Sequence, residues 1–197
     1  EEEEEDFSLY EQQGDQVAAA RRQITRALKD EQRYERTVQR CACCKPSLYD
    51  LHVGTYFTLR LKAQSLRLAP SHCELLPRAH VESTLRLDDD AHRELASIKS
   101  AVRAMHAAEG SGATCFAESA VEFSSMPHVC VDCVPVERGM EAEIRYSYRE
   151  ALTDINTEWA RNSKIHELVA DRPLRRALPH HVEYVSCEWA APAAAAA

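Results

Sequence analysis

The sequence is poor in glycine, and this scarcity excludes several common nucleotide-binding and hydrolase motifs. Only five of its 197 residues are glycine, and none of them forms a GxGxxG fingerprint or a GxxxxGK[ST] phosphate-binding loop. A GxSxG sequence is also missing, which excludes the nucleophile elbow of an α/β-hydrolase. The function therefore has to be sought outside these classes.

Long apolar runs and an excess of positive charge are missing as well. No apolar run reaches the roughly 18 residues of a membrane span, so we expect no membrane partner. The acidic start does not match the basic-then-apolar pattern of a signal peptide. Of 32 acidic residues, six form the run at 1–6, and the remaining 26 nearly balance the 24 Lys and Arg residues. Bulk charge thus gives little reason to expect nonspecific nucleic-acid binding.

What the sequence does contain begins with a charged helical arm. Residues 1–15 are expected to be a disordered acidic lead-in. Over 16–40, Val17, Ile24 and Val38 belong to an apolar stripe with three-four spacing, which predicts a helix. This helix either faces a partner or packs on its own domain, and both alternatives stay open.

The rest of the chain alternates between predicted strands and helices. Strands are expected within 52–61 and at 73–76, 113–117 and 128–136, with a helix that starts after Asp88 and stops at Gly110. This order predicts an α+β fold with a mainly antiparallel sheet over 41–138. A further helix is expected at 141–168, inside a 139–170 segment. A possible strand at 182–186 and an alanine-rich end follow within 171–197.

The cysteines give the strongest chemical signal. Eight are present, and without a signal peptide the cytosol or nucleus is favoured, where clustered cysteines more often bind metal than form disulfides. Cys41-x-x-Cys44 can bend around one ion, and His80 and His128 lie near predicted strand ends as further ligand candidates. The gaps of 35 and 47 residues are too long for a zinc finger and suit an ion embedded in a larger fold. Alternatively, the cysteines are two reduced thiols and His80 faces solvent, or Cys43 replaces either cysteine.

The strand predicted at 128–136 carries the second signal. Alternation places His128, Cys130 and Asp132 on one face. The opposite face then holds Val129 and its apolar neighbours. One ligand candidate and two polar or nucleophilic groups would therefore share a face, unless this is an ordinary strand with mixed faces.

Several motifs in order resemble one known family. The run SHCELLPRAHVES at 71–83 is similar to the GHxLxxPxxH segment of histidine-triad (HIT) folds, and more closely resembles the CwfJ-type, Cwf-nineteen-like splicing factors. The upstream CxxC, LRLDDDA at 85–91, FAES at 116–119 and the His128-x-x-x-x-Cys-Val-Pro run fit the same pattern. The resemblance covers about residues 41–190.

The resemblance implies a HIT-like, mainly antiparallel sheet domain over 41–138, with packed helices and a structural zinc, preceded by the helical arm. It implies that residues 171–197 begin a second CwfJ C-terminal domain and run into the alanine-rich end. In zinc-bearing relatives the ligands match Cys41, Cys44, His80 and His128 of this chain. An active HIT enzyme has three alternating histidines where this chain has His128, Cys130 and Asp132. We therefore expect no catalytic residue, and no cofactor other than the zinc.

The function implied by the resemblance is that of a nuclear, non-enzymatic spliceosome component. It would act in late, intron-lariat complexes as a docking scaffold for RNA and protein, linked to spliceosome disassembly and lariat debranching. The implied partners are spliceosomal proteins, small nuclear RNAs, the intron lariat and the lariat-debranching enzyme. Two alternatives are a divergent HIT-type nucleotide hydrolase or transferase with Cys130 as nucleophile, and a zinc-binding adaptor unrelated to splicing.

Overall fold

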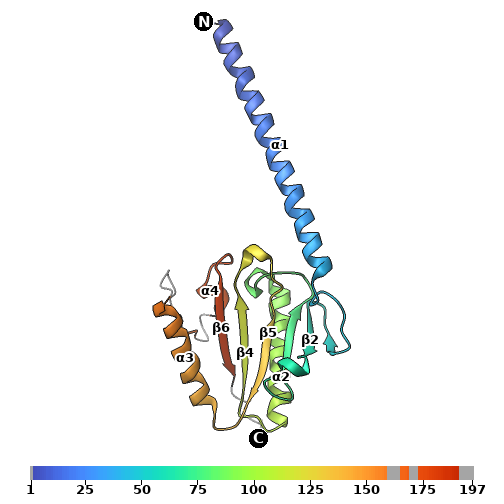
Figure 1. Ribbon diagram of the computed structural model, residues 1–197, viewed down its shortest axis with the longest axis vertical. Coiled ribbons are helices and arrows are strands. Elements are labelled where there is room, and N and C mark those ends of the chain that lie inside the picture. The colour runs from blue at the N-terminus through green and yellow to red at the C-terminus, as the bar shows by residue number, and fades with distance from the viewer. Residues whose placement is uncertain (1, 159–164, 169–172, 191–197) are drawn as a thin grey trace. The chain divides into compact units, whose positions relative to one another are not determined.

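The computed structural model describes residues 2–158, 165–168 and 173–190 of the chain (Figure 1). The chain divides into two units, residues 1–42 and residues 43–197, and each is described by itself. Within the described part of the chain, no helix combines the length and the apolar character needed to cross a lipid bilayer.

The first unit is one helix, α1, which spans Glu2–Arg40. The helix predicted at 16–40 lies inside it, but residues 2–15 of the lead-in are helical where we expected disorder. Glutamate is a good helix former, and acidic side chains near a helix N-terminus interact favourably with the positive end of the helix dipole. The acidic run therefore extends the helix toward the N-terminus.

The second unit is built on a six-stranded sheet in the order β1-β2-β3-β5-β4-β6, in which every neighbouring pair is antiparallel. The predicted α+β class with an antiparallel sheet is confirmed. The strands are β1 (Asp50–Val53), β2 (Phe57–Leu61), β3 (Cys73–Pro77), β4 (Ala113–Ala120), β5 (Val131–Val136) and β6 (Tyr184–Ala190). The helices of this unit are α2 (Asp89–Ala108), α3 (Glu141–Glu158) and α4 (Leu174–Ala177), with short 3-10 turns at Gln64–Leu66, Thr84–Arg86 and Phe123–Ser125.

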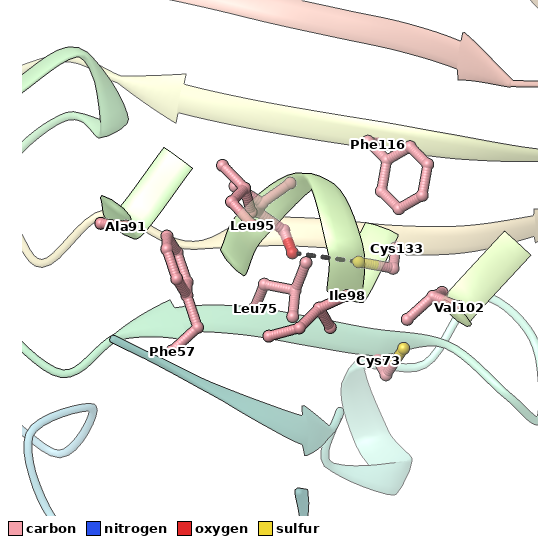
Figure 2. Packing of buried hydrophobic residues seen from close by; sticks show 10 residues of the cluster. Phe57, Cys73, Leu75, Ala91, Leu95, Ile98, Val102, Phe116 and Cys133 are labelled. Atoms are coloured by element: carbon pink, nitrogen blue, oxygen red, sulfur yellow. Dashed lines mark hydrogen bonds between the residues drawn. The ribbon is translucent and has the colours of Figure 1, made fainter. Parts of the chain in front are cut away.

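Helix α2 starts where the sequence predicted and covers one face of the sheet. Its N-cap is Asp88, whose carboxylate accepts a hydrogen bond from the Ala91 backbone N–H at 2.8 Å. Its buried stripe packs against alternate residues of the strands, and Figure 2 shows these side chains gathered between helix and sheet. Burying a large apolar side chain contributes about 1.5–3 kcal/mol, so this layer stabilises the packing of α2 on the sheet. The cluster consists of Phe57, Cys73, Leu75, Ala91, Leu95, Ile98, Val102, Phe116, Val131 and Cys133.

A carboxylate of α2 also holds the turn between β1 and β2. Glu94 accepts hydrogen bonds from the backbone N–H groups of Thr55, Tyr56 and Phe57, at 3.1, 2.9 and 2.8 Å. Three donors on one carboxylate satisfy backbone groups that the strand ladder leaves unpaired. The β1–β2 hairpin is thereby fixed to the helix.

Two predicted elements are shorter than expected. Strand β5 begins at Val131, so His128 and Cys130 precede it. The Val129 N–H instead donates to the Val81 carbonyl at 2.8 Å. The helix predicted at 141–168 ends at Glu158 as α3, and residues 165–168 are not helical. Residues 159–164 and 169–172 and the alanine-rich end at 191–197 lie outside the described residues.

The segment expected to open a second domain belongs to the same sheet. The strand predicted at 182–186 is β6, which begins at Tyr184 and pairs with β4 from Ala120↔Tyr184 to Thr114↔Ala190. The rings of Tyr148 on α3 and Trp189 on β6 contact each other with centroids 6.3 Å apart. An edge strand has a row of backbone N–H and C=O groups without partners. In this sheet β6 supplies the partners for that row on β4.

Candidate metal centre

The sheet topology brings the predicted histidine ligands to one edge. His80 follows β3, and His128 precedes β5 by three residues. Because β3 and β5 are antiparallel neighbours with Leu75 opposite Val131, the end of one lies beside the start of the other. The third group, Cys44, comes from the loop before β1.

These three side chains converge within hydrogen-bonding distance of one another. Cys44 Sγ lies 3.3 Å from Nδ1 of His80 and 3.3 Å from Nδ1 of His128, and the two Nδ1 atoms are 3.2 Å apart. With Cys41, they form a group whose potential ligand atoms all lie within 4.8 Å of one another. Cys43 lies outside this group. All four candidates named from the sequence are therefore brought together, and the group could hold a metal ion.

Backbone carbonyls assign the proton of each imidazole. Nε2 of His80 lies 3.0 Å from the Met126 carbonyl oxygen, and Nε2 of His128 lies 2.9 Å from that of Pro77. A carbonyl only accepts, so each Nε2 carries a proton, and the Nδ1 atoms are the ones that face Cys44 and each other. Nδ1 of each ring is therefore the atom that a metal ion held by this group would meet.

The geometry and the protonation state both fit a tetrahedral ion. Bonds of about 2.0–2.1 Å to nitrogen and about 2.3 Å to sulfur place the donors of a tetrahedron roughly 3.3–3.8 Å apart, close to the separations found here. Burial and the neighbouring His80 lower the pKa of His128 to about 4, although its hydrogen bond to Pro77 opposes this. His128 is therefore neutral at pH 7, as a metal ligand must be.

A second cluster lies next to the first, at the other two positions of the predicted triad. Potential ligand atoms of Glu74, Cys130 and Asp132 lie within 4.8 Å of one another. Here the protein provides the positive charge, because the Lys62 ammonium is 2.8 Å from Glu74 and 2.7 Å from Asp132. Nε2 of His72 lies 3.1 Å from the same Asp132 oxygen. The sequence pattern did not indicate that Lys62 pairs with these carboxylates, although the cross-strand pair Glu74↔Asp132 needs a nearby cation.

Cys130 does not have the environment of an activated nucleophile. Burial, together with the negative charge of Asp132, raises the pKa of the Cys130 thiol to about 12. The thiolate is the reactive form, so Cys130 is essentially unreactive at neutral pH. Burial follows the predicted alternation, since Val129, Val131 and Cys133 are buried while Cys130 and Asp132 are half-buried.

Comparison with known proteins places these residues in a family context. Residues 28–150 match the family described as "Protein similar to CwfJ C-terminal". The chain is 26% identical over 174 residues to the CWF19-like protein 2 homolog of Drosophila melanogaster, covering 85% of this chain and 25% of that protein. It is 29% identical over 98 residues to the Pre-mRNA-splicing factor cwf19 of Schizosaccharomyces pombe, covering 50% of this chain and 15% of that protein. The chain thus spans a quarter or less of the length of these two relatives.

A similar solved structure is that of a Zn-bound histidine triad family protein from Mycobacterium smegmatis. The two share 15% sequence identity, with a TM-score of 0.41, over 61% of this chain and 99% of that one.

Proposed function

Because the chain belongs to the family of proteins similar to the CwfJ C-terminal region, we propose that it acts in pre-mRNA splicing. The observation that carries this proposal is the family match over residues 28–150, joined by a relative named as a pre-mRNA-splicing factor. The proposed place is the nucleus, in late complexes that contain the intron lariat. The proposed role is a docking scaffold for spliceosomal proteins, small nuclear RNAs and the lariat, linked to spliceosome disassembly and to the lariat-debranching enzyme.

Within that scaffold, Cys41, Cys44, His80 and His128 are proposed to hold one structural zinc ion. Zinc prefers thiolate sulfur and imidazole nitrogen, and this donor set supplies two of each. When bound, the ion would supply a positive charge that the cysteine sulfurs and the two imidazole rings share. The residues would tie the loop before β1 to the adjoining ends of β3 and β5. Four protein ligands leave no open coordination position, which favours a structural role over a catalytic one.

The chemistry of the triad positions favours a non-enzymatic role. His128 is committed to the metal centre, Cys130 stays protonated at neutral pH, and Asp132 is ion-paired to Lys62. A carboxylate at the third position repels a phosphate instead of stabilising its developing charge. In the alternative, a HIT-type nucleotide hydrolase or transferase, Cys130 would have to ionise against its raised pKa, and the Lys62 ammonium is already paired with two carboxylates.

Affinity purification from nuclear extract tests this proposal. The tagged chain and its Cys44→Ser variant would be purified in parallel, and the bound RNA sequenced. We expect excised lariat introns and small nuclear RNAs with the parent chain and their loss with Cys44→Ser, whereas Cys43→Ser should behave like the parent.

The other outcomes identify the alternatives. Zinc in the purified protein without any enriched RNA would indicate an adaptor unrelated to splicing. Nucleotide hydrolysis that disappears in Cys130→Ala would overturn the non-enzymatic assignment.

A further inference from the structure

Helix α1 carries a continuous basic stripe over its C-terminal half. The basic residues recur at a spacing of four, three, four, three and four positions, which keeps them on one side of an α-helix. At about 100° per residue they fall within an arc of about 80°. Every position of that arc from residue 22 to residue 40 is a lysine or an arginine. The basic stripe consists of Arg22, Arg26, Lys29, Arg33, Arg36 and Arg40.

The near balance of charge beyond the acidic start hides this local excess. Seven Lys and Arg residues occur in 21–40, and six of them belong to the stripe. The acidic residues of the same stretch, Asp30, Glu31 and Glu35, lie outside its arc. All six basic residues are exposed. The stripe is therefore a one-sided row of positive charge on an exposed face of α1.

The row has the dimensions and the chemistry that suit a chain of phosphates. The 18 positions that separate Arg22 from Arg40 correspond to a rise of about 27 Å, or about 5.4 Å for each successive cation. A nucleic-acid strand carries one negative charge per nucleotide at regular intervals, so a straight row of cations can follow its backbone. Five of the six stripe residues are arginines, whose planar guanidinium groups bind phosphate through two hydrogen bonds.

The opposite side of α1 does not favour a lipid surface. It contains the apolar stripe to which Val17, Ile24 and Val38 belong, and Glu31 and Glu35 interrupt that stripe. A helix that lies on a bilayer buries its apolar face at the acyl boundary, where these two carboxylates would lose their hydration. Protein surfaces usually intersperse both signs of charge. A uniform row of cations therefore fits a nucleic-acid backbone better than an acidic protein.

We propose that the basic stripe of α1 binds the phosphate backbone of an RNA strand. Because its six cations lie within one narrow arc, they meet a single line of phosphates and leave the base edges unread. The contact is therefore sensitive to salt and insensitive to nucleotide sequence. The choice of RNA as the nucleic acid rests on the proposed role in splicing.

Exchanging neighbouring arginine and glutamine residues tests the stripe without a change in composition. Three such pairs occur in the stretch, and their exchange moves three of the six cations by about 100° around the helix. The net charge stays constant, and arginine and glutamine have similar helix propensities, so α1 should remain helical. The exchange variant carries Arg22→Gln, Gln23→Arg, Gln32→Arg, Arg33→Gln, Gln39→Arg and Arg40→Gln.

Binding of a fluorescein-labelled oligouridine of about 12 nucleotides to the full, zinc-loaded chain would be measured by fluorescence anisotropy at about 50–200 mM salt. For six contacts to a single strand, the logarithm of the binding constant should fall against the logarithm of the salt concentration with a slope of about −4. The exchange variant should bind about tenfold or more weakly at about 100 mM salt, with a slope of about −2.

A matched pair of single substitutions sharpens the test. Lys29→Gln removes one cation of the stripe and should reduce the steepness of the salt dependence by about 0.7. Arg21→Gln removes one cation of the same helix that lies outside the arc, so affinity and slope should stay at the parent values. Each variant is first shown to have the zinc content, the helicity and the melting temperature of the parent.

Other results would overturn the proposal. Equal affinity and equal slope in the parent and the exchange variant would show that net charge alone explains the binding. Absence of oligouridine binding at about 50 mM salt would show that the stripe is solvated surface. Vesicles of phosphatidylserine and phosphatidylcholine that bind the parent and not the exchange variant, without RNA binding, would assign the stripe to a membrane.

Failure of this inference is distinguishable from failure of the splicing role. Equal oligouridine binding by the parent and the exchange variant, with lariat introns recovered from nuclear extract, would overturn the stripe alone. Oligouridine binding that depends on the stripe, without lariat introns in the nuclear purification, would keep the stripe and overturn the splicing role.

Discussion

Cys44 Sγ and the Nδ1 atoms of His80 and His128 lie within 3.3 Å of one another, whereas the neighbouring Glu74 and Asp132 share the ammonium of Lys62. Both clusters contain groups that ligate metals, and both involve the loop or strand at 128–136. They differ in the source of their positive charge. In the acidic cluster, Lys62 from the connection between β2 and β3 already supplies the positive charge. The proximity of side chains that can ligate a metal therefore does not by itself define a metal site. The informative sign is the donor set, because the first group combines two cysteines with two histidines, which zinc prefers, and the second has two carboxylates and one cysteine.

The largest effect is expected from removing a ligand of the first cluster. Cys44→Ser and His128→Ala should each abolish stoichiometric zinc binding and lower the melting temperature of the second unit by roughly 10 °C or more, since metal-binding energy is folding energy. Zinc content by mass spectrometry and thermal unfolding by circular dichroism measure this. A chelator added to the parent protein should reproduce the loss.

Cys43→Ser is the matched control for these variants. It changes a thiol in the same loop but outside the ligand group, so zinc content and melting temperature should stay at the parent values. If Cys43→Ser lowered the melting temperature and Cys44→Ser did not, the ligand would be Cys43 and not Cys44.

An intermediate effect is expected from removing the internal cation of the second cluster. The substitution Lys62→Met leaves Glu74 and Asp132 close together without a cation between them. Breaking a largely buried ion pair costs about 2–4 kcal/mol in unfolding free energy, after allowance for the partial exposure of Asp132. The melting temperature should fall by roughly 5–10 °C. Added Mg²⁺, which prefers carboxylate ligands, should then stabilise this variant and leave the parent unchanged.

The pH dependence of this pair has a definite sign. Burial opposes the charged form, but hydrogen bonds to Asp132 and Glu74 raise the pKa of Lys62 above its ordinary value. Because the pKa of Lys62 is higher in the folded protein than in the unfolded protein, its stabilising effect is complete below the unfolded-state pKa. The effect is lost only as pH rises through the folded-state pKa. The difference in the free energy of unfolding between the parent and Lys62→Met should therefore be constant from pH 6 to 9. Asp132→Asn in the Lys62→Met background should recover part of the loss, and no recovery would contradict the charge argument.

The smallest effect is expected at the boundary between the clusters. Cys130→Ala removes a half-buried thiol that is neither a proposed zinc ligand nor charged, so we expect a change within about 1 kcal/mol and full zinc content. Thermal unfolding and metal analysis of the purified variant measure both. A large loss of stability with loss of zinc would make Cys130 a ligand and join the two clusters into one site.

The sequence predicted features that depend on local pattern or on the family motifs. Asp88 capped α2 as expected, because acidic residues before an apolar-periodic segment are a local signal. The four ligand candidates followed from the CxxC spacing and the motif resemblance. By contrast, neither the Lys62 pairs nor the Pro77 and Met126 carbonyls that set the imidazole protons could be foreseen, since each joins residues distant in sequence.

The edges of elements were less predictable for a related reason. The alternation over 128–136 gave the correct faces, but the Val129–Val81 hydrogen bond delays the start of β5 to Val131. For β6, sequence patterning indicated a strand and could not indicate its partner. Pairing with β4 joins residues more than 60 positions apart and is decided only when both strands exist.

The position of β6 has a practical consequence for protein engineering. The family match ends at residue 150, yet the sheet is completed by residues 184–190. A fragment cut at the family boundary would leave β4 with an open row of backbone donors and acceptors, the kind of edge that recruits other chains and aggregates. The sheet is therefore longer than the segment that the family match covers, and an expressed fragment needs β6 as well as the strands up to β5.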